Sequence, residues 1–486
     1  MNNPGFFTIT LGVSLLCTAC GSVGPDYNRP TVADIPTEWK IAASWQQASP
    51  ADGIPKKEWW KTFGDKKLDE LEANCLKENP NLKAAVARLD QALAQSNAHG
   101  AGATPTVALN AGASRSLISA NRPLGNYAVP NNSTVQNDFK PNVTVSYEVD
   151  WLGHVRRDIE SARASAEQAA ADRENVRLVL TAQVASAYFQ LRQLDEEISF
   201  VTSSITLQEK VLDLTRIRQE NGAAAESDVL LQSAMAESSS AQLELLKNQR
   251  KQAEDLLATL TGVPAASFSL SSGTLPVAPP VVPAGVPANL LERRPDIASA
   301  ERAMAAANAQ IGVAKAAYFP SLNLTPALAG FESNNLSTLF STPSLVWSIG
   351  VQASQNLFDG GRNRAGVDFA KAGYVVALAN YRQSVLVAIQ ETQDALNTLH
   401  GLSAAKQKQE AAVRNQNRAY EITVLRYKEG LDNALTLATI QQNQLSALRV
   451  QSQIRGGLFL SAVSLLKALG GGWQDSEMNE NSRTMN

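Results

Sequence analysis

The chain has 486 residues and is poor in cysteine, in aromatic residues and in charge of either sign. Its three cysteines cannot form a disulfide framework, and aromatic residues make up only 6% of the chain. Charged residues account for 18%, and 43 basic against 46 acidic side chains leave a formal net charge of −3. This balance excludes a nucleic-acid binder that relies on a basic surface. No apolar run reaches the roughly 18–20 residues of a transmembrane helix, which excludes a multi-helix transporter but not a membrane protein made of strands.

Motifs of catalysis, nucleotide binding and metal binding are missing as well. The sequence contains no G-x-G-x-x-G, no P-loop, no H-E-x-x-H and no G-x-S-x-G. The three histidines, His99, His154 and His400, lie apart without the spacing of metal ligands. We therefore expect neither an enzyme nor a bound cofactor or metal ion.

The N-terminus has the pattern of a cleaved and lipidated leader. Phe6 to Ala19 is an apolar stretch of 14 residues, which fits a signal peptide and is too short to span a bilayer. Small residues directly precede Cys20, as at a lipoprotein cleavage site, so we expect lipid on the thiol of Cys20. Gly21 is compatible with sorting to the outer membrane. The same cysteine pairs with Cys17 in a C-x-x-C spacing, so a redox or zinc pair is the alternative interpretation.

An internal repeat divides the rest of the chain. Residues 154–262 have the pattern of helix, short turn and helix, and residues 361–470 repeat it. The turn glycines Gly222 and Gly430 are 208 positions apart. A repeat of this kind indicates two copies of one structural unit.

The first helix of each copy is predicted to be unusually long. No proline or glycine occurs from Val155 to about Glu220, a length of roughly 65 residues or ~100 Å. Apolar or small residues recur there in steps of three and four, which is typical of a coiled-coil seam. Such a helix must pack against equally long neighbours.

Strand patterns occur in two pairs, each around a polar loop. The pairs are about 104–118 with 140–151, and about 320–331 with 345–358. Several stretches alternate between apolar and polar residues, the period of a sheet with unlike faces. Four strands are too few to close a barrel in a membrane, so several chains must share one: three copies supply 12 strands and two supply 8.

Short motifs along nearly the whole chain match one family. They are Val23-Gly24-Pro25-Asp26-Tyr27, Trp59-Trp60, Asn79-Pro80-Asn81-Leu82, Tyr147 to Arg157 (YEVDWLGHVRR), Leu290 to Pro295 (LLERRP) and Leu357 to Arg362 (LFDGGR). With these motifs the chain resembles the TolC-like outer-membrane efflux proteins, in particular the lipoprotein (NodT-type) branch of tripartite efflux systems. The resemblance implies a mainly α fold with a β-barrel part. Long antiparallel helices form a trimeric α-barrel, and four strands per chain contribute to a shared 12-stranded outer-membrane β-barrel.

The resemblance and the patterns together define the expected domains. In chain order these are a signal peptide (1–19), a lipid-anchored extended segment (20–64), a first repeat (65–262) with its helical hairpin (154–262), an equatorial linker (263–289), a second repeat (290–470) with its hairpin (361–470), and a disordered tail (471–486).

By the same resemblance, the turns between the long helices form a periplasmic tip that closes the channel. Tyr427 and Asp228 match a tyrosine–aspartate lock between the two hairpins, and Leu435 matches an apolar constriction. Thr439 stands where many relatives have an acidic residue, so an acidic ring is missing, and Asp432 is a partial substitute.

The resemblance also implies the partners of the chain. A periplasmic membrane-fusion adaptor docks at the two turns, which contain Arg218, Gly222, Arg426 and Gly430. The other partners are two further copies of the chain, outer-membrane lipid and an inner-membrane pump, most often of the RND type. We therefore expect a passive outer-membrane channel of a tripartite efflux pump, which extends into the periplasm of a Gram-negative cell. The alternative is a lipid-anchored periplasmic coiled-coil scaffold or adaptor without a pore.

Overall fold

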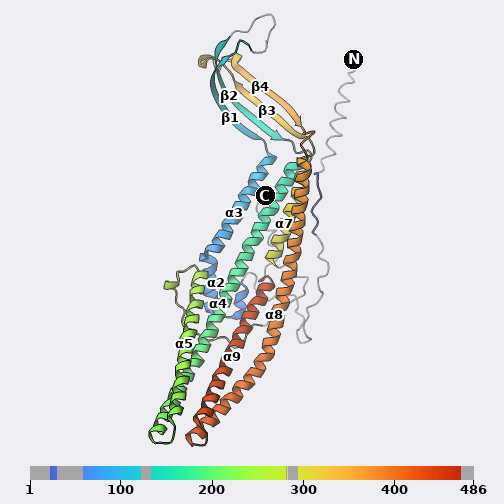
Figure 1. The fold of residues 1–486 in the computed structure, drawn as a ribbon. Coiled ribbons are helices and arrows are strands. Elements are labelled where there is room, and N and C mark those ends of the chain that lie inside the picture. The colour runs from blue at the N-terminus through green and yellow to red at the C-terminus, as the bar shows by residue number, and fades with distance from the viewer. Residues whose placement is uncertain (1–21, 30–57, 122–132, 281, 283–293, 472–486) are drawn as a thin grey trace. The chain divides into compact units, whose positions relative to one another are not determined.

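The computed structural model describes residues 22–29, 58–121, 133–280, 282 and 294–471 (Figure 1). The helices are α2 (Lys66–Glu78), α3 (Pro80–Gly100), α4 (His154–Glu220), α5 (Glu226–Leu260), α7 (Pro295–Ala316), α8 (Arg362–Lys428) and α9 (Ala434–Ala468). The strands are β1 (Thr106–Ile118), β2 (Thr134–Glu148), β3 (Ser321–Phe331) and β4 (Leu345–Ser354). Short 3₁₀ turns at Trp59–Phe63, Ala101–Ala103, Ala265–Ser267, Leu336–Thr338 and Thr342–Ser344 complete the elements. No helix of the described ranges is long and apolar enough to cross a membrane.

The chain forms two compact units that cut across the two predicted repeats. Unit 1 comprises residues 1–30, 90–168 and 301–380, and unit 2 comprises residues 31–89, 169–300 and 381–486. Each unit therefore contains residues of both repeats. The long helices α4 and α8, of 67 residues each, begin in unit 1 and end in unit 2. The units therefore divide each long helix into two parts, whereas the repeats divide the chain into a first and a second half.

The described strands of unit 1 form one antiparallel sheet in the order β1-β2-β3-β4 (Figure 1). β2 begins at Thr134 and not near residue 140, so the predicted start was wrong. The added residues pair with the second half of β1, for example Thr134 with Ile118, and their polar composition hides the alternation that identifies a strand. β2 also ends at Glu148 and β4 at Ser354, three and four residues before the predicted ends, because the chain turns there into the long helices.

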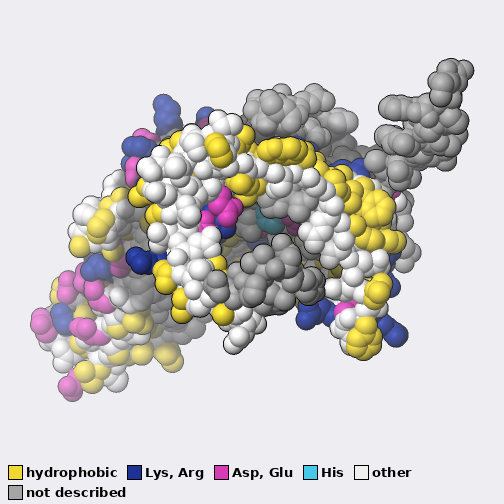
Figure 2. All heavy atoms as spheres, turned by 90° about the horizontal axis from the view of Figure 1, so that it is seen from above, with side chains coloured by type: hydrophobic (Ala, Val, Ile, Leu, Met, Phe, Trp, Pro, Cys, Tyr) yellow, Lys and Arg dark blue, Asp and Glu magenta, His cyan; other side chains and the backbone are white. Residues whose placement is uncertain are grey.

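The sheet exposes apolar side chains that no described residue of unit 1 covers. On β1 these include Val107 and Leu109, and on β4 they include Trp347, Ile349 and Val351. Ser348, Gly350 and Gln352 alternate with them, so from Trp347 onward one face of the strand is apolar and the other is polar. Figure 2, seen from above, shows yellow hydrophobic side chains at the surface beside white polar ones. Such a face needs lipid or another protein against it.

Unit 2 contains a cluster of packed aromatic residues. Phe189 lies 4.8 Å from Phe63 and 4.8 Å from Phe459 between ring centroids, and Trp59 packs on Phe63 at 6.3 Å. All but Phe63 are almost fully buried. This cluster joins the 3₁₀ turn before α2 to α4 and α9, and therefore fixes the helices that lead to the turns described next.

Candidate functional site at the helical turns

The two turns between the long helices have the same backbone geometry. Gly222 has φ +71° and Gly430 has φ +77°, a left-handed conformation that glycine adopts without strain. The amide of Gly222 donates to the carbonyl of Gln219, and that of Gly430 donates to the carbonyl of Tyr427. Each turn thus ends its first helix with a glycine cap. The sequence repeat is also a repeat of backbone structure.

Tyr427, the last aromatic residue of α8, is buried against α4. Its side chain is 3% exposed and packs with Val211 and Leu437 in a small apolar cluster. Its hydroxyl lies 2.8 Å from Oγ1 of Thr215, and the hydroxyl of Thr215 donates to the carbonyl of Val211 at 2.8 Å. Because the single proton of Thr215 is used there, the phenol of Tyr427 donates to Thr215.

Three further contacts join the hairpins of the two repeats. Arg218 on α4 donates from Nη1 to the carbonyl of Tyr427 at 2.6 Å, and its guanidinium carbon lies 4.8 Å from the centre of the Tyr427 ring. Gln232 on α5 donates to the carbonyl of Ala434 at 3.3 Å. A charged donor and a cation–π contact are the stronger interactions of this group. We call these five residues, Thr215, Arg218, Gln232, Tyr427 and Ala434, the hairpin latch.

The structure does not bring Tyr427 and Asp228 together. Oδ2 of Asp228 accepts from the backbone amide of Ala225 at 3.3 Å, within the first turn of its own helix α5. The expected lock between these two side chains is therefore replaced, within one chain, by Tyr427 with Thr215. The sequence patterns did not identify Thr215 as the partner of Tyr427. The available signal was Thr423, a second threonine at the equivalent position of the other repeat.

Asp432 is part of the second turn and already has a partner. Its carboxylate accepts from Nε of Arg426 at 2.8 Å and from Nη2 at 3.3 Å. This ion pair raises the pKa of the Arg426 guanidinium. Because the two charges offset each other, Asp432 adds little negative field to the tip.

Leu435 and Thr439 lie on the exposed side of α9. Leu435 is 61% exposed, and the hydroxyl of Thr439 donates to the carbonyl of Leu435 at 2.9 Å. Thr439 is thus satisfied by its own helix and contributes no charge. Leu435 presents a large apolar side chain that no described part of the chain covers.

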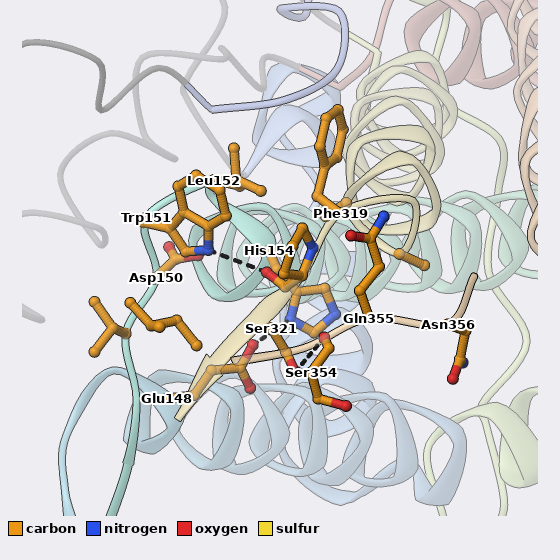
Figure 3. A pocket seen from close by; sticks show the side chains of 15 residues that line it. Glu148, Asp150, Trp151, Leu152, His154, Phe319, Ser321, Ser354, Gln355 and Asn356 are labelled. Carbon is orange, nitrogen blue, oxygen red and sulfur yellow. Dashed lines mark hydrogen bonds and ion pairs between the residues drawn. The ribbon is translucent and has the colours of Figure 1, made fainter. Parts of the chain in front are cut away.

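A second candidate site is the pocket at the corner between the strands and the helices in unit 1 (Figure 3). Its volume is about 220 Å³, and Trp151, His154 and Phe319 are among the residues that line it. Nδ1 of His154 lies 3.3 Å from a carboxylate oxygen of Glu148, and the indole of Trp151 donates to the carbonyl of Pro320 at 3.1 Å. The lining of the pocket therefore combines aromatic side chains with hydrogen-bonded polar groups.

The other residues considered as redox or metal sites form no such site in the described part of the chain. Cys17 and Cys20 lie outside the described residues. His99 pairs with Asp158, and no group of three or more histidine, cysteine, aspartate or glutamate residues in the ranges described could hold a metal ion.

Comparisons with known proteins agree on one family. A sequence model of the outer membrane efflux proteins matches residues 72–263 and 286–471. The chain is 34% identical over 466 residues to the pyoverdine export outer membrane protein OpmQ of Pseudomonas aeruginosa. This match covers 96% of each chain. Its fold is similar to that of the outer-membrane channel OprN, with a TM-score of 0.85, 31% identity and coverage of 93% of this chain and 99% of that one. The Campylobacter jejuni CmeC outer membrane channel gives a TM-score of 0.85 at 26% identity, with 95% and 98% covered.

Proposed function

Because this chain belongs to the outer membrane efflux protein family, we propose that it is the outer-membrane channel of a tripartite efflux pump. Solved relatives with the same fold along nearly their whole length are outer-membrane channels, which supports this role. The channel conducts passively, and an inner-membrane pump supplies the energy through a periplasmic adaptor. A pump of the RND type is the partner that the family resemblance favours.

The working form in this proposal is a trimer anchored by lipid on Cys20. Each chain has four strands with an apolar face, and β1 and β4 are each paired on one side only among the described strands. Three sheets joined edge to edge satisfy these free edges, and lipid covers the apolar face. Repeated around the same axis, the exposed Leu435 forms an apolar ring, a type of constriction that can close a pore by excluding water. With Thr439 uncharged and Asp432 paired, this constriction carries no acidic ring.

The observation that carries the gating part of the proposal is the hairpin latch. It joins the tip of one hairpin to the tip of the other through hydrogen bonds and one cation–π contact, which can break when the hairpins separate. An adaptor that docks at the turns around Gly222 and Gly430 shifts the tip toward the open state if it binds the separated hairpins more tightly. Arg218 and Arg426 each lie four residues before the turn glycine, within the region where such a partner docks.

Single-channel conductance in a planar bilayer tests this proposal. We expect a small current from the purified wild-type oligomer and an open fraction at least about tenfold higher in Arg218→Ala, because a hydrogen bond from a charged donor contributes about 1.5–3 kcal/mol. Asp228→Ala is the matched control, since it removes only a hydrogen bond within α5. Wild-type current in Arg218→Ala after verified insertion contradicts the gate. A protein that never inserts favours the coiled-coil scaffold without a pore.

A further inference from the structure

The pairing of the strands in unit 1 shows which residues share one face of the sheet. Leu109 on β1 pairs with Val143 on β2, and Val143 pairs with Ala329 on β3. Ala329 in turn pairs with Trp347 on β4. Residues directly opposite each other on neighbouring strands point to the same side of a sheet. These four residues therefore define one side, which we call the apolar face.

Aromatic side chains lie at the loop end of the apolar face. Phe139 is four residues before Val143 on β2, and Phe331 is two residues after Ala329 on β3, so both belong to this face. Phe340, in the loop between β3 and β4, packs on Phe331 with 5.3 Å between the ring centroids. Because Phe340 is 73% exposed, the loop adds an uncovered aromatic ring to the apolar face.

Hydrogen bonds within the loop hold the backbone on both sides of Phe340. The side chain of Asn335 accepts from the amide of Ser337 at 3.0 Å. The hydroxyl of Ser341 donates to the carbonyl of Thr338 at 2.7 Å, and that of Ser344 donates to the same carbonyl at 2.9 Å. The loop therefore presents Phe340 in a defined place.

Among the described strands, the apolar face carries a charge only at Arg115, near the loop end of β1. Arg115 pairs in register with Asn137 and is exposed, and no described residue forms an ion pair with it. The charges on the opposite face are paired, since Lys140 lies 2.8 Å from Asp138 and 3.2 Å from Glu332. Arg115 can therefore bind an anion from outside the chain.

The position of Arg115 along β1 fits the level of lipid head groups. This step rests on the proposed function, in which the strands cross the outer membrane and the loops lie outside. From Val107 to Arg115 the strand rises about 27 Å, which is about 21 Å across a membrane at a tilt of ~40°. The apolar band of an outer-membrane barrel is about 25 Å tall. Arg115 thus lies near the outer boundary, where a basic residue costs little and its long stem carries the guanidinium to the head groups.

We propose that the loop end of the apolar face is a binding site for an anionic, phosphate-bearing lipid of the outer leaflet. The guanidinium of Arg115 binds the phosphate, and Phe139, Phe331 and Phe340 contact the acyl chains below it. Arginine suits this role because its planar fork donates two parallel hydrogen bonds to a phosphate. Aromatic side chains occupy the same level in outer-membrane barrels.

Lipid retention by the purified full-length oligomer tests this site. The probes are dioleoylphosphatidylglycerol and dioleoylphosphatidylcholine, which share their acyl chains and differ in net charge. Native mass spectrometry in a non-ionic detergent measures how much of each lipid is retained. We expect wild type to prefer the anionic lipid, and Arg115→Gln to lower the ratio of the two by about fivefold, the usual contribution of one basic residue at an anionic membrane surface. We expect Phe340→Ala to lower retention of both lipids and to leave their ratio unchanged.

Two matched variants show whether the effect belongs to the charge at this position. Arg115→Lys keeps the charge without the planar fork, and we expect an intermediate ratio. Arg364→Gln removes an exposed arginine on α8 of the same unit, and we expect the wild-type ratio.

Three results overturn the proposal. The first is a wild-type ratio in Arg115→Gln, and the second is wild-type retention of both lipids in Phe340→Ala. The third is displacement of the anionic lipid by millimolar inorganic phosphate, because the site then recognises an anion and not a lipid.

Conductance of the same preparations separates this proposal from the proposed function. A conducting channel whose lipid ratio does not depend on Arg115 overturns the lipid site alone. A protein that neither inserts nor conducts overturns the channel, and the lipid site with it.

Discussion

Glu72 on α2 is a buried carboxylate without a hydrogen-bond partner, and its removal has a predictable effect on stability. The residue is fully buried in unit 2, and neither carboxylate oxygen has a partner among the described residues. Burial raises its pKa well above the ordinary value, Arg177 on α4 opposes this, and Asp69 adds to it. The folded protein therefore holds the Glu72 proton more tightly than the unfolded chain does.

The sign of the pH dependence follows from this raised pKa. Below the ordinary glutamate pKa both states are protonated and Glu72 costs no charge burial. As the pH rises from there to the raised folded-state pKa, the unfolded chain loses its proton first, and stability falls. Glu72→Gln keeps the shape and removes the ionisation. We expect it to stabilise the protein at pH 7–8 by about 1.4 kcal/mol for each unit by which the folded-state pKa exceeds the ordinary value, and to lose this advantage near pH 4.

Thermal unfolding of the detergent-solubilised protein across pH 4–8 measures this difference. We expect the two melting curves to separate progressively as the pH rises. Glu70→Gln is the control, because Glu70 lies on the same helix in a surface ion pair with Lys67 at 2.6 Å, and such pairs contribute little. A Glu72→Gln protein that is less stable at pH 7, with a pH profile parallel to wild type, refutes the reasoning and means that Glu72 is ionised and paired.

Two further substitutions test the latch and the start of α7. Tyr427→Phe removes only the hydrogen bond to Thr215, about 1 kcal/mol, so we expect a higher open fraction in bilayer recordings but a smaller rise than for Arg218→Ala. Arg294→Ala removes a buried guanidinium that donates to Glu391 at 2.8 Å and to a backbone carbonyl, and we expect a loss of about 3–5 kcal/mol in unfolding experiments. Arg418→Ala, which breaks an exposed pair, should leave that stability unchanged.

The helices and turns could be predicted from sequence because their signals are local. The absence of proline and glycine from Val155 to Glu220 and the seam of apolar residues predict α4, and the glycines Gly222 and Gly430 predict its end and that of α8. The start of β2 could not be predicted in this way. Residues such as Gln136 and Asn137 form a strand because β1 pairs with them, and a pairing partner is not visible in local composition.

The candidate site shows the same limit at the level of single contacts. The turn glycine Gly430 predicts that Tyr427 lies at the tip. The partner of Tyr427, however, depends on which residues of α4 face α8. Thr215 is seven residues before Gly222 and fully buried, whereas Asp228 lies on the next helix and is occupied by the Ala225 amide. The family resemblance favours Asp228 as the partner, and only the packing of α4 against α8 favours Thr215.

The composition of the latch suits a closure that a protein partner can open. A neutral hydrogen bond contributes about 1 kcal/mol, one from a charged donor about 1.5–3 kcal/mol, and a cation–π contact about 0.5–1 kcal/mol. With its two neutral hydrogen bonds, one chain then holds its hairpins with about 4–6 kcal/mol, and three chains with about 12–18 kcal/mol. A nanomolar protein interface supplies about 12 kcal/mol, which is of the same size. A deeply buried ion pair in place of Tyr427 and Thr215 would leave an uncompensated charge on opening, so the neutral pair keeps the open state within reach of adaptor binding.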